Sequence, residues 1–224
     1  MKELLSNISI QVNKNIYLKN PESSELGKKI LLGGIDLIFE KGFESLTFKK
    51  LGQLIKSPEA SVYRYFENKH KLLLYLTSWY WSWMEYRLAF GLANISSAYE
   101  RLEKAILILT EPVKRDGNFL HIDEEKLNAI VISESSKVYL NKHVDSDNNE
   151  GAFLGYKQLV QRVSEIVLEI NPEYKYPHML ISTVIEGTHS QRFFAEHLPK
   201  LTDVIINEDS IIEFYKGMVN KSIK

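Results

Sequence analysis

The sequence predicts an all-α protein in two parts: an N-terminal three-helix domain containing a helix-turn-helix, and a larger C-terminal helical bundle. Apolar residues recur three and four positions apart through most of the 224 residues, which is the period of an α-helix. Strand signals are scarce, because no alternating apolar run is bracketed by a hairpin turn. Two short helical segments joined by a tight turn lie between residues 47 and 66. Such a pair forms a helix-turn-helix, whose second helix fits the major groove of DNA.

Composition excludes several classes of protein. Hydrophobic residues make up 44% of the chain and charged residues 25%, as in ordinary soluble globular proteins. There is no Cys, which excludes disulfides and thiolate metal sites. No apolar run approaches the roughly 18 residues of a membrane span, and the polar-interrupted N-terminus does not resemble a signal peptide. We therefore expect a cytoplasmic protein with no membrane partner.

The distribution of charge is more informative than the net charge of −1. Residues 28–76 hold nine Lys/Arg and five Asp/Glu, whereas residues 77–224 hold sixteen and twenty-one. The positive segment therefore coincides with the predicted helix-turn-helix, as a phosphate-binding module requires. Chance clustering of four charges remains the alternative.

The first elements are an arm and a long helix. Residues 1–20 are interpreted as an N-terminal arm that is either frayed or packed on the body. Asn20-Pro21-Glu22 is a helix start, and Gly42 ends that helix because it accepts a positive φ after the last turn. The buried stripe of this helix is expected to be Ile30, Leu31, Ile35, Ile38 and Phe39. Gly33-Gly34 in mid-helix indicates close helix packing, since each Gly costs about 1 kcal/mol relative to Ala.

The helix-turn-helix occupies the next segment. Thr47 is expected to cap its first helix, and Leu51, Leu54 and Ile55 form the apolar face of that helix. Ser57-Pro58-Glu59 is the start signal of the second helix, with Ser57 as cap and Pro58 at the first helical position. Val62 and Phe66 are expected to point inward and Ser61, Arg64 and Tyr65 outward, and Asn68 caps the following helix.

The rest of the chain predicts further helices. They are expected over residues 69–92, 97–114, 123–140 after an Asp123 cap, 150–170, 177–198, and 208–222 after an Asn207 cap. The polar segment from Asn141 to Glu150 is predicted to be a loop. The resulting domain organisation is an arm (1–20), a helix-turn-helix domain (21–76) and a C-terminal domain (77–224).

Residues 30–76 resemble the DNA-binding domain of the TetR family of bacterial regulators. Phe39, Gly42, Phe43 and Thr47 match the family's first helix and the connection after it. The second part of the pattern is matched by Ser61, Val62, Tyr63, Tyr65, Phe66, Lys69, Leu72 and Leu73. The sequence departs from the family at the turn, where Lys56-Ser57-Pro58 replaces Gly, an aliphatic residue and a capping residue. A non-Gly residue at positive φ costs something like 1 kcal/mol, so a turn of different shape is one expectation.

The resemblance implies a homodimeric transcription regulator, typically a repressor, that binds a palindromic operator in double-stranded DNA and is released by a small-molecule effector. Side-chain chemistry assigns base contacts to Glu59, Ala60, Ser61 and Arg64. The full set of predicted DNA-contacting residues is Thr47, Lys49, Lys50, Ser57, Glu59, Ala60, Ser61, Tyr63, Arg64 and Lys69. For Glu59 the alternative is a helix-start charge, and for Tyr63 and Lys69 the alternatives are packing and a solvated charge.

In the family, the region after residue 76 binds effectors and forms the dimer. The resemblance implies that the last two long helices form a four-helix interface with a partner subunit. Interface candidates are Ile181, Val184, Ile185, Phe193, Ile211, Phe214, Tyr215 and Met218. Effector-pocket candidates are Trp83, Tyr86, Arg87, Phe90, Tyr156 and His189. The alternative for the aromatic residues is ordinary core packing.

Catalysis and metal binding find little support. Glu186 and His189 share a helix face, but di-iron chemistry needs a second such pair and two more inward carboxylates. No Gly-rich phosphate loop or Gly-x-Ser-x-Gly elbow is present. We expect no enzyme activity, cofactor or metal. The rival hypothesis is a helical bundle that binds a small molecule or metal without specific DNA recognition.

Overall fold

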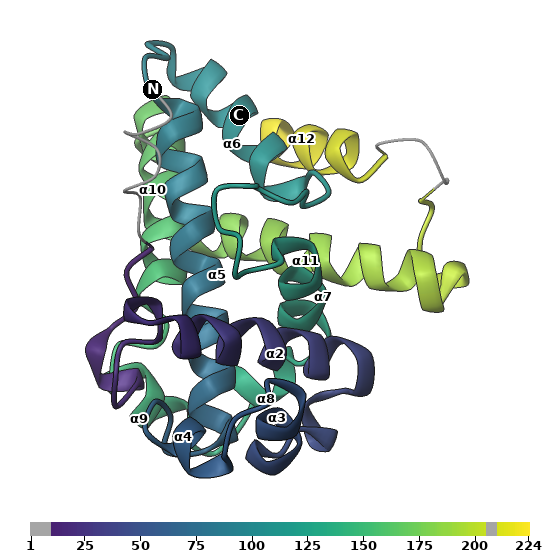
Figure 1. Ribbon diagram of the computed structural model, residues 1–224. Coiled ribbons are helices and arrows are strands. Elements are labelled where there is room, and N and C mark those ends of the chain that lie inside the picture. Colours follow the sequence, from purple (N-terminus) through teal and green to yellow (C-terminus); the bar gives the residue numbers. More distant parts are fainter. Residues whose placement is uncertain (1–9, 205–209) are drawn as a thin grey trace. The chain divides into compact units, whose positions relative to one another are not determined.

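The computed structural model describes residues 10–204 and 210–224, and every regular element in these ranges is a helix (Figure 1). The all-α prediction is therefore confirmed. The chain forms two compact units. Unit 1 comprises the described part of Met1–Trp83 together with Val113–Gly155, and unit 2 comprises Met84–Pro112 and the described part of Tyr156–Lys224. No helix in the described ranges is long and apolar enough to cross a membrane.

Unit 1 begins with two 3-10 turns, η1 (Lys14–Ile16) and η2 (Pro21–Ser23), followed by α2 (Glu25–Lys41). Residues 1–9 of the predicted arm lie outside the described residues. The expected start at Asn20 is a separate turn: the Asn20 side chain accepts from the Glu22 N–H, whereas Ser24 caps α2. Gly42 ends α2 with φ of 75°. A further 3-10 turn, η3 (Phe43–Ser45), leads to α3.

The paired glycines of α2 lie against the helices that follow. A Cβ on Gly33 would lie 2.7 Å from Cγ2 of Ile55, and a Cβ on Gly34 would lie 3.2 Å from Cδ2 of Leu72. The glycines thus allow close approach of the end of α3 and the start of α5. Phe39 was expected in the buried stripe, but it is 49% exposed; Lys126 lies over its ring at 5.7 Å.

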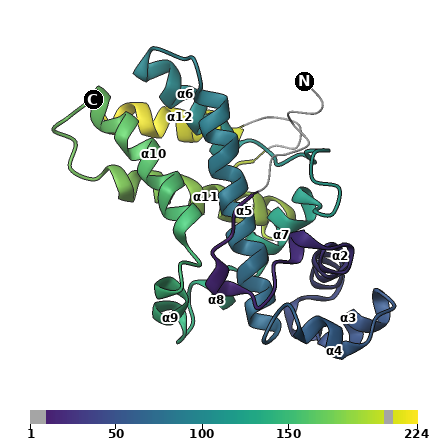
Figure 2. The same cartoon turned by 60° about the vertical axis from the view of Figure 1, so that its left-hand side comes forward.

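Three helices follow: α3 (Phe48–Leu54), α4 (Glu59–Tyr63) and α5 (Lys69–Leu92). Figure 2 shows α3 and α4 next to each other in unit 1. The division between the units falls between Trp83 and Met84, so α5 contributes residues to both.

The middle of the chain completes unit 1 with α7 (Glu124–Ser133), α8 (Ser135–Val138) and α9 (Val144–Asn149). Asp123 caps α7 as predicted, and α7 packs against α2. The single helix expected over 123–140 is interrupted at Glu134, whose buried carboxylate accepts from the Phe43 N–H at 2.8 Å and from Lys137 Nζ at 2.6 Å.

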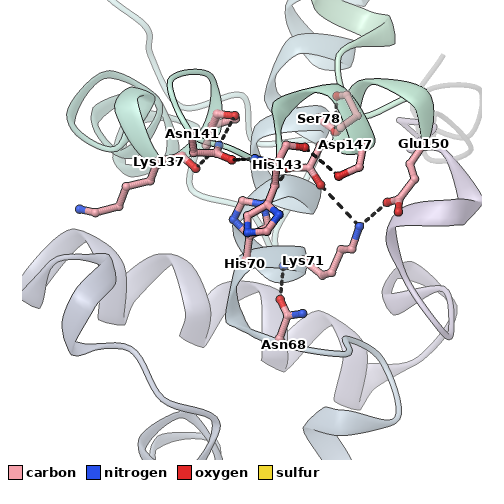
Figure 3. Close-up of polar contacts among 12 residues, drawn as sticks. Asn68, His70, Lys71, Ser78, Lys137, Asn141, His143, Asp147 and Glu150 are labelled. Carbon is pink, nitrogen blue, oxygen red and sulfur yellow. Dashed lines mark hydrogen bonds and ion pairs between the residues drawn. The ribbon is translucent and has the colours of Figure 1, made fainter.

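The loop predicted over 141–150 instead contains α9. Its Asp147 is buried and lies 2.8 Å from His70 Nε2 and 3.6 Å from Lys71 Nζ, at the start of α5 (Figure 3). Glu150 pairs with the same Lys71. The polar sequence of this segment therefore forms a partly buried polar network that holds α9 against α5.

Unit 2 contains the end of α5, α6 (Ala98–Thr110), α10 (Leu154–Ile170) from Tyr156 onward, α11 (Pro177–His197), the turn η4 (Pro199–Leu201) and α12 (Ser210–Ser222). Both α11 and α12 pack against α6 and against each other. Gly187 on α11 allows close approach of the Tyr215 side chain on α12, because a Cβ at position 187 would lie 2.1 Å from the Tyr215 hydroxyl oxygen. Asn207, the expected cap of the last helix, lies outside the described residues.

Candidate nucleic-acid interface

The first helix of the candidate interface is α3, which is capped at its start and anchored by buried side chains. Thr47 Oγ1 accepts from the Lys50 N–H at 3.2 Å, so the predicted cap is confirmed. Phe48 and Leu51 are buried, which anchors the helix in unit 1. Leu54, predicted on the apolar face, is half exposed at the end of the helix.

The turn after α3 retains the geometry that a glycine would give it. Ile55 is the C-cap, Lys56 has φ of 54°, and the Ser57 N–H donates to Gly52 O at 2.8 Å. The Lys56 N–H donates to Gln53 O at 3.3 Å. These bonds are the two that define a Schellman motif, in which the residue after the C-cap adopts a left-handed conformation. The turn therefore does not change shape; Lys56 adopts the conformation that is usual for glycine.

The second helix, α4, presents a polar face. Val62 is fully buried, while Glu59, Ala60, Tyr63 and Arg64 are exposed. Arg64 follows the last residue of the helix as its C-cap. The start differs from the prediction: Pro58 is the N-cap and no side chain caps the helix, because the backbone of the half-buried Ser57 closes the preceding turn.

Two side chains of this segment that were predicted to point outward are not fully exposed. Ser61 is half-buried. Tyr65 is buried, and its hydroxyl lies 2.8 Å from Ser24 Oγ, the cap of α2. Tyr65 thus links the segment that follows α4 to the start of α2, and it does not point outward.

Among four of the predicted positioning residues, Lys69 and Lys50 form hydrogen bonds within unit 1, Tyr63 makes a ring contact there, and Lys49 has no polar partner among the described residues. Lys69 Nζ donates to Phe43 O at 3.3 Å and to Glu44 O at 3.4 Å, and lies 4.5 Å from the centre of the Phe43 ring. Lys50 Nζ donates to Ser45 O at 2.9 Å. Lys49 is exposed without a hydrogen bond or ion pair to another described residue, and Tyr63 packs its ring edge-on against Phe48 at 4.8 Å.

The residues that support the interface from a distance could not be found in the sequence. Glu134 lies 91 positions from the Phe43 N–H that it accepts, and no spacing signals such a contact. Asn68, in contrast, caps α5 through the Lys71 N–H at 2.9 Å, as the local sequence predicts.

The family model described as bacterial regulatory proteins of the tetR family matches residues 30–76. This span contains α3, the Lys56 turn, α4 and the first residues of α5. Residues 30–76 therefore match the DNA-binding domain of the TetR family. Within this matched segment, α4 is the second helix of the helix-turn-helix. No curated protein matches the chain in sequence.

Solved structures share the fold over most of the chain at low identity. The fatty acid degradation regulator FadR from Bacillus halodurans is 15% identical with a TM-score of 0.59, covering 87% of this chain and 96% of its own. AibR, solved with isovaleryl coenzyme A and operator DNA, is 16% identical with a TM-score of 0.56, covering 88% and 98%. The ketosteroid transcriptional regulator KstR2 of Mycobacterium tuberculosis is 13% identical with a TM-score of 0.56, covering 95% and 96%.

The predicted effector residues divide between the units. Trp83 belongs to unit 1, is fully buried, and donates from Nε1 to Asp116 at 3.3 Å. The other five belong to unit 2. Within that unit Tyr86 stacks on Phe90 at 6.2 Å, Arg87 pairs with Glu111 at 2.9 Å, and Tyr156 donates to Glu186 at 2.6 Å. His189 is half-buried, and burial together with Arg192 lowers its pKa to about 4.

The predicted dimer residues also divide by exposure. Ile181, Val184, Ile185, Ile211 and Tyr215 are buried within unit 2, so they form its core and offer no free surface. Phe193 and Phe214 are exposed, and Met218 is half-buried. Of the predicted interface residues, these three are the ones that are not buried within unit 2.

Proposed function

We propose that the protein is a repressor that binds a palindromic operator as a homodimer and is released by a small-molecule effector. This proposal rests on the exposed face of α4. Four residues are exposed there, namely Glu59, Ala60, Tyr63 and Arg64, while the buried Val62 anchors the helix on its inner side. A recognition helix needs this arrangement, because its inner side must be fixed while its outer side enters the groove. Since the proposed target is chromosomal DNA, the cytoplasm is the expected location.

Base reading is assigned to the exposed side chains of α4. Arg64 carries the fork of donors that pairs with guanine O6 and N7, Glu59 accepts from cytosine N4, and Ala60 contacts a thymine methyl. Lys49 and Tyr63 position the helix on the phosphates. Lys69 would join them by exchanging part of its bonding to Phe43 and Glu44 for a phosphate oxygen.

Dimerisation is assigned to the exposed apolar side chains of α11 and α12. Phe214 is 61% exposed and Phe193 38% exposed, and large exposed apolar groups on neighbouring helices are typical of interaction sites. Two subunits related by a two-fold axis would then place their α4 helices in successive major grooves, about 34–36 Å apart.

Effector binding is assigned to unit 2. Its aromatic and polar candidates are Tyr86, Arg87, Phe90, Tyr156 and His189. The similarity to AibR, which was solved with both an acyl coenzyme A and operator DNA, supports an arrangement with two ligands. To move the protein from mostly bound to mostly free, the effector must favour the released state by about 5.5 kcal/mol.

The proposal is tested by measuring DNA affinity as a function of salt for the wild type and for Arg64→Ala. We expect the wild type to lose affinity steeply with salt. We expect Arg64→Ala to lose about 1–3 kcal/mol on a matched operator and to discriminate less at one base pair. Operator fragments are obtained by sequencing the DNA that co-purifies with the protein. Equal binding of both proteins to matched and mismatched sites would contradict specific readout.

The rival, a small-molecule- or metal-binding bundle without DNA recognition, predicts no salt-dependent retention on DNA. Within the described ranges no three His, Asp or Glu side chains are grouped as a metal site. Glu186, half of the Glu-x-x-His pair on α11, accepts from Tyr156. Metal analysis of the purified protein completes the comparison of the two hypotheses.

A further inference from the structure

Lys56 stands in a backbone conformation that lysine rarely adopts. Among the described residues, only Lys56 and Asn94 have positive φ without being glycine. Asparagine tolerates this region because its short side chain bonds locally, whereas lysine has no such compensation. Strained conformations of this kind persist where the surroundings impose them, and they concentrate at functional sites.

The surroundings of Lys56 do impose the conformation. The Ser57 N–H donates to Gly52 O at 2.8 Å, which closes the end of α3. A Cβ on Gly52 would lie 2.6 Å from Ser57 O and 3.3 Å from Glu59 N, so the turn and the start of α4 pack directly on the backbone of α3. This packing sets the crossing of α3 and α4 and leaves residue 56 in the left-handed region, whatever its side chain.

The Lys56 side chain makes no compensating polar contact with the described residues. It is exposed and has no hydrogen bond or ion pair with any residue in the described part of the chain. Lys50 and Lys69, in contrast, donate to backbone carbonyls. An exposed cation at a strained backbone position, with no hydrogen-bond or ion-pair partner among the described residues, is available to a partner outside the chain.

We propose that Lys56 contacts a DNA phosphate beside the groove that α4 enters, which rests on the proposed function. The residue lies three positions before Glu59, the first residue of α4. Two other exposed cations of the helix-turn-helix, Lys49 and Arg64, likewise lack hydrogen-bond and ion-pair partners among the described residues. Lysine suits the role, because a flexible stem carries its point charge to a phosphate. Lys56 is a positioning residue that adds affinity on any sequence.

The competing explanation is structural. Lys56 follows the C-terminus of α3, where a cation interacts favourably with the helix dipole. The two roles predict opposite effects of Lys56→Gly on stability. If the charge stabilises α3, glycine lowers the melting temperature; if the lysine is retained for DNA, glycine relieves strain and raises it.

The experiment compares Lys56→Gly, Lys56→Gln and Lys56→Arg in the full chain. Binding to a short labelled random-sequence duplex is titrated between about 50 and 200 mM salt, since phosphate contacts need no operator. We expect Lys56→Gly to raise the melting temperature by up to about 4 °C. We expect Lys56→Gly and Lys56→Gln to weaken binding on the order of 10-fold per subunit near 0.1 M salt, and to reduce the salt slope by about 0.9 per lost contact. We expect Lys56→Arg to keep the wild-type affinity and the wild-type salt slope.

Three results would overturn the assignment. Wild-type affinity and slope in both neutral variants would show that Lys56 touches no phosphate. A lower melting temperature for Lys56→Gly would assign the lysine to the end of α3. If the wild type shows no salt-dependent binding at all, the proposed function is overturned as well. This result differs from the first two, which leave the proposed function in place.

Discussion

The hydroxyl of Tyr63 is the cleanest single group with which to probe phosphate contact. Its ring packs edge-on against Phe48, with the ring centres 4.8 Å apart, and the residue is 49% exposed. Lys69 is less suitable, because its ammonium donates to Phe43 O and Glu44 O inside unit 1. Lys69→Ala would therefore change stability and binding together.

We predict that Tyr63→Phe weakens DNA binding by about 0.5–1.5 kcal/mol on any sequence, while the melting temperature stays unchanged because the ring contact with Phe48 remains. Fluorescence anisotropy on matched and random duplexes measures the first quantity, and thermal unfolding the second. A loss confined to one operator sequence would show that Tyr63 reads a base.

Side chains whose partners are local in sequence were predictable, and those with distant partners were not. Thr47, Asn68 and Asp123 cap the helices that follow them, as the residue types indicate. Tyr65 looked outward by helical spacing, but it is buried against Ser24, 41 positions away. The conformation of Lys56 likewise depends on packing against Gly52 and could not be read from the turn sequence alone.

At the scale of elements, the crossing of α3 and α4 depends on the missing side chain of Gly52. We predict that Gly52→Ala destabilises the protein by about 1–3 kcal/mol and weakens DNA binding, because the Cβ would push Ser57 O and the start of α4 away. Gly217→Ala is the matched control: nothing lies within 4 Å of its added Cβ in α12. Alanine there should stabilise by up to about 1 kcal/mol. Equal urea midpoints for the two variants would contradict the close approach.

The attachment of α9 to α5 depends on one buried carboxylate. Asp147 lies between His70 Nε2 and Lys71 Nζ (Figure 3). We predict that Asp147→Ala destabilises unit 1 by about 1–3 kcal/mol, because His70 Nε2 loses its hydrogen-bond partner while Lys71 keeps Glu150. The neighbouring exposed Asp145→Ala is the control and should change stability by less than about 0.5 kcal/mol. Urea unfolding measures both; a similar small effect for the two would contradict the role given to Asp147.

Helix existence was predictable from the sequence, while interruptions and the short α9 were not. The helices over 69–92 and 177–197 begin and end close to the expected positions. The interruption of 123–140 at Glu134 has no Gly or Pro to signal it; it accompanies the bond from the Phe43 N–H. Residues 141–150 have the composition of a loop, yet Asp147 and Glu150 find cationic partners on α5.

At the scale of the whole molecule, the two compact units of the structure do not coincide with the domains predicted from the sequence. The predicted DNA-binding segment, 21–76, lies in unit 1 together with residues 113–155. Lys126 pairs with Asp36 at 2.6 Å and Glu134 holds Phe43, so the middle of the chain supports the helix-turn-helix. The functional boundary at residue 76 stays a prediction, whereas the physical unit around α4 is discontinuous in sequence.

The stability of the full chain should fall in acid through His189. Its pKa in the folded protein is about 4, below the ordinary 6.5, because burial and Arg192 disfavour the charged form. The unfolded chain therefore binds the proton more tightly, and stability present above pH 6.5 is lost as the pH falls toward 4. We predict a loss of up to about 3 kcal/mol that His189→Gln removes. His197→Gln, at the exposed end of the same helix, is the control and should keep the wild-type pH dependence of urea unfolding. Parallel curves for all three proteins would contradict the prediction.

The central claim is that the exposed face of α4 is presented in duplicate to duplex DNA. Selection of bound sequences from a random DNA pool tests it most directly. We expect the wild type to enrich an inverted repeat whose half-sites are centred about one helical turn, or a whole multiple of it, apart. Arg64→Ala should relax one position in each half-site. Enrichment of no common sequence, or of a single unrepeated motif that Arg64→Ala leaves unchanged, would contradict the account.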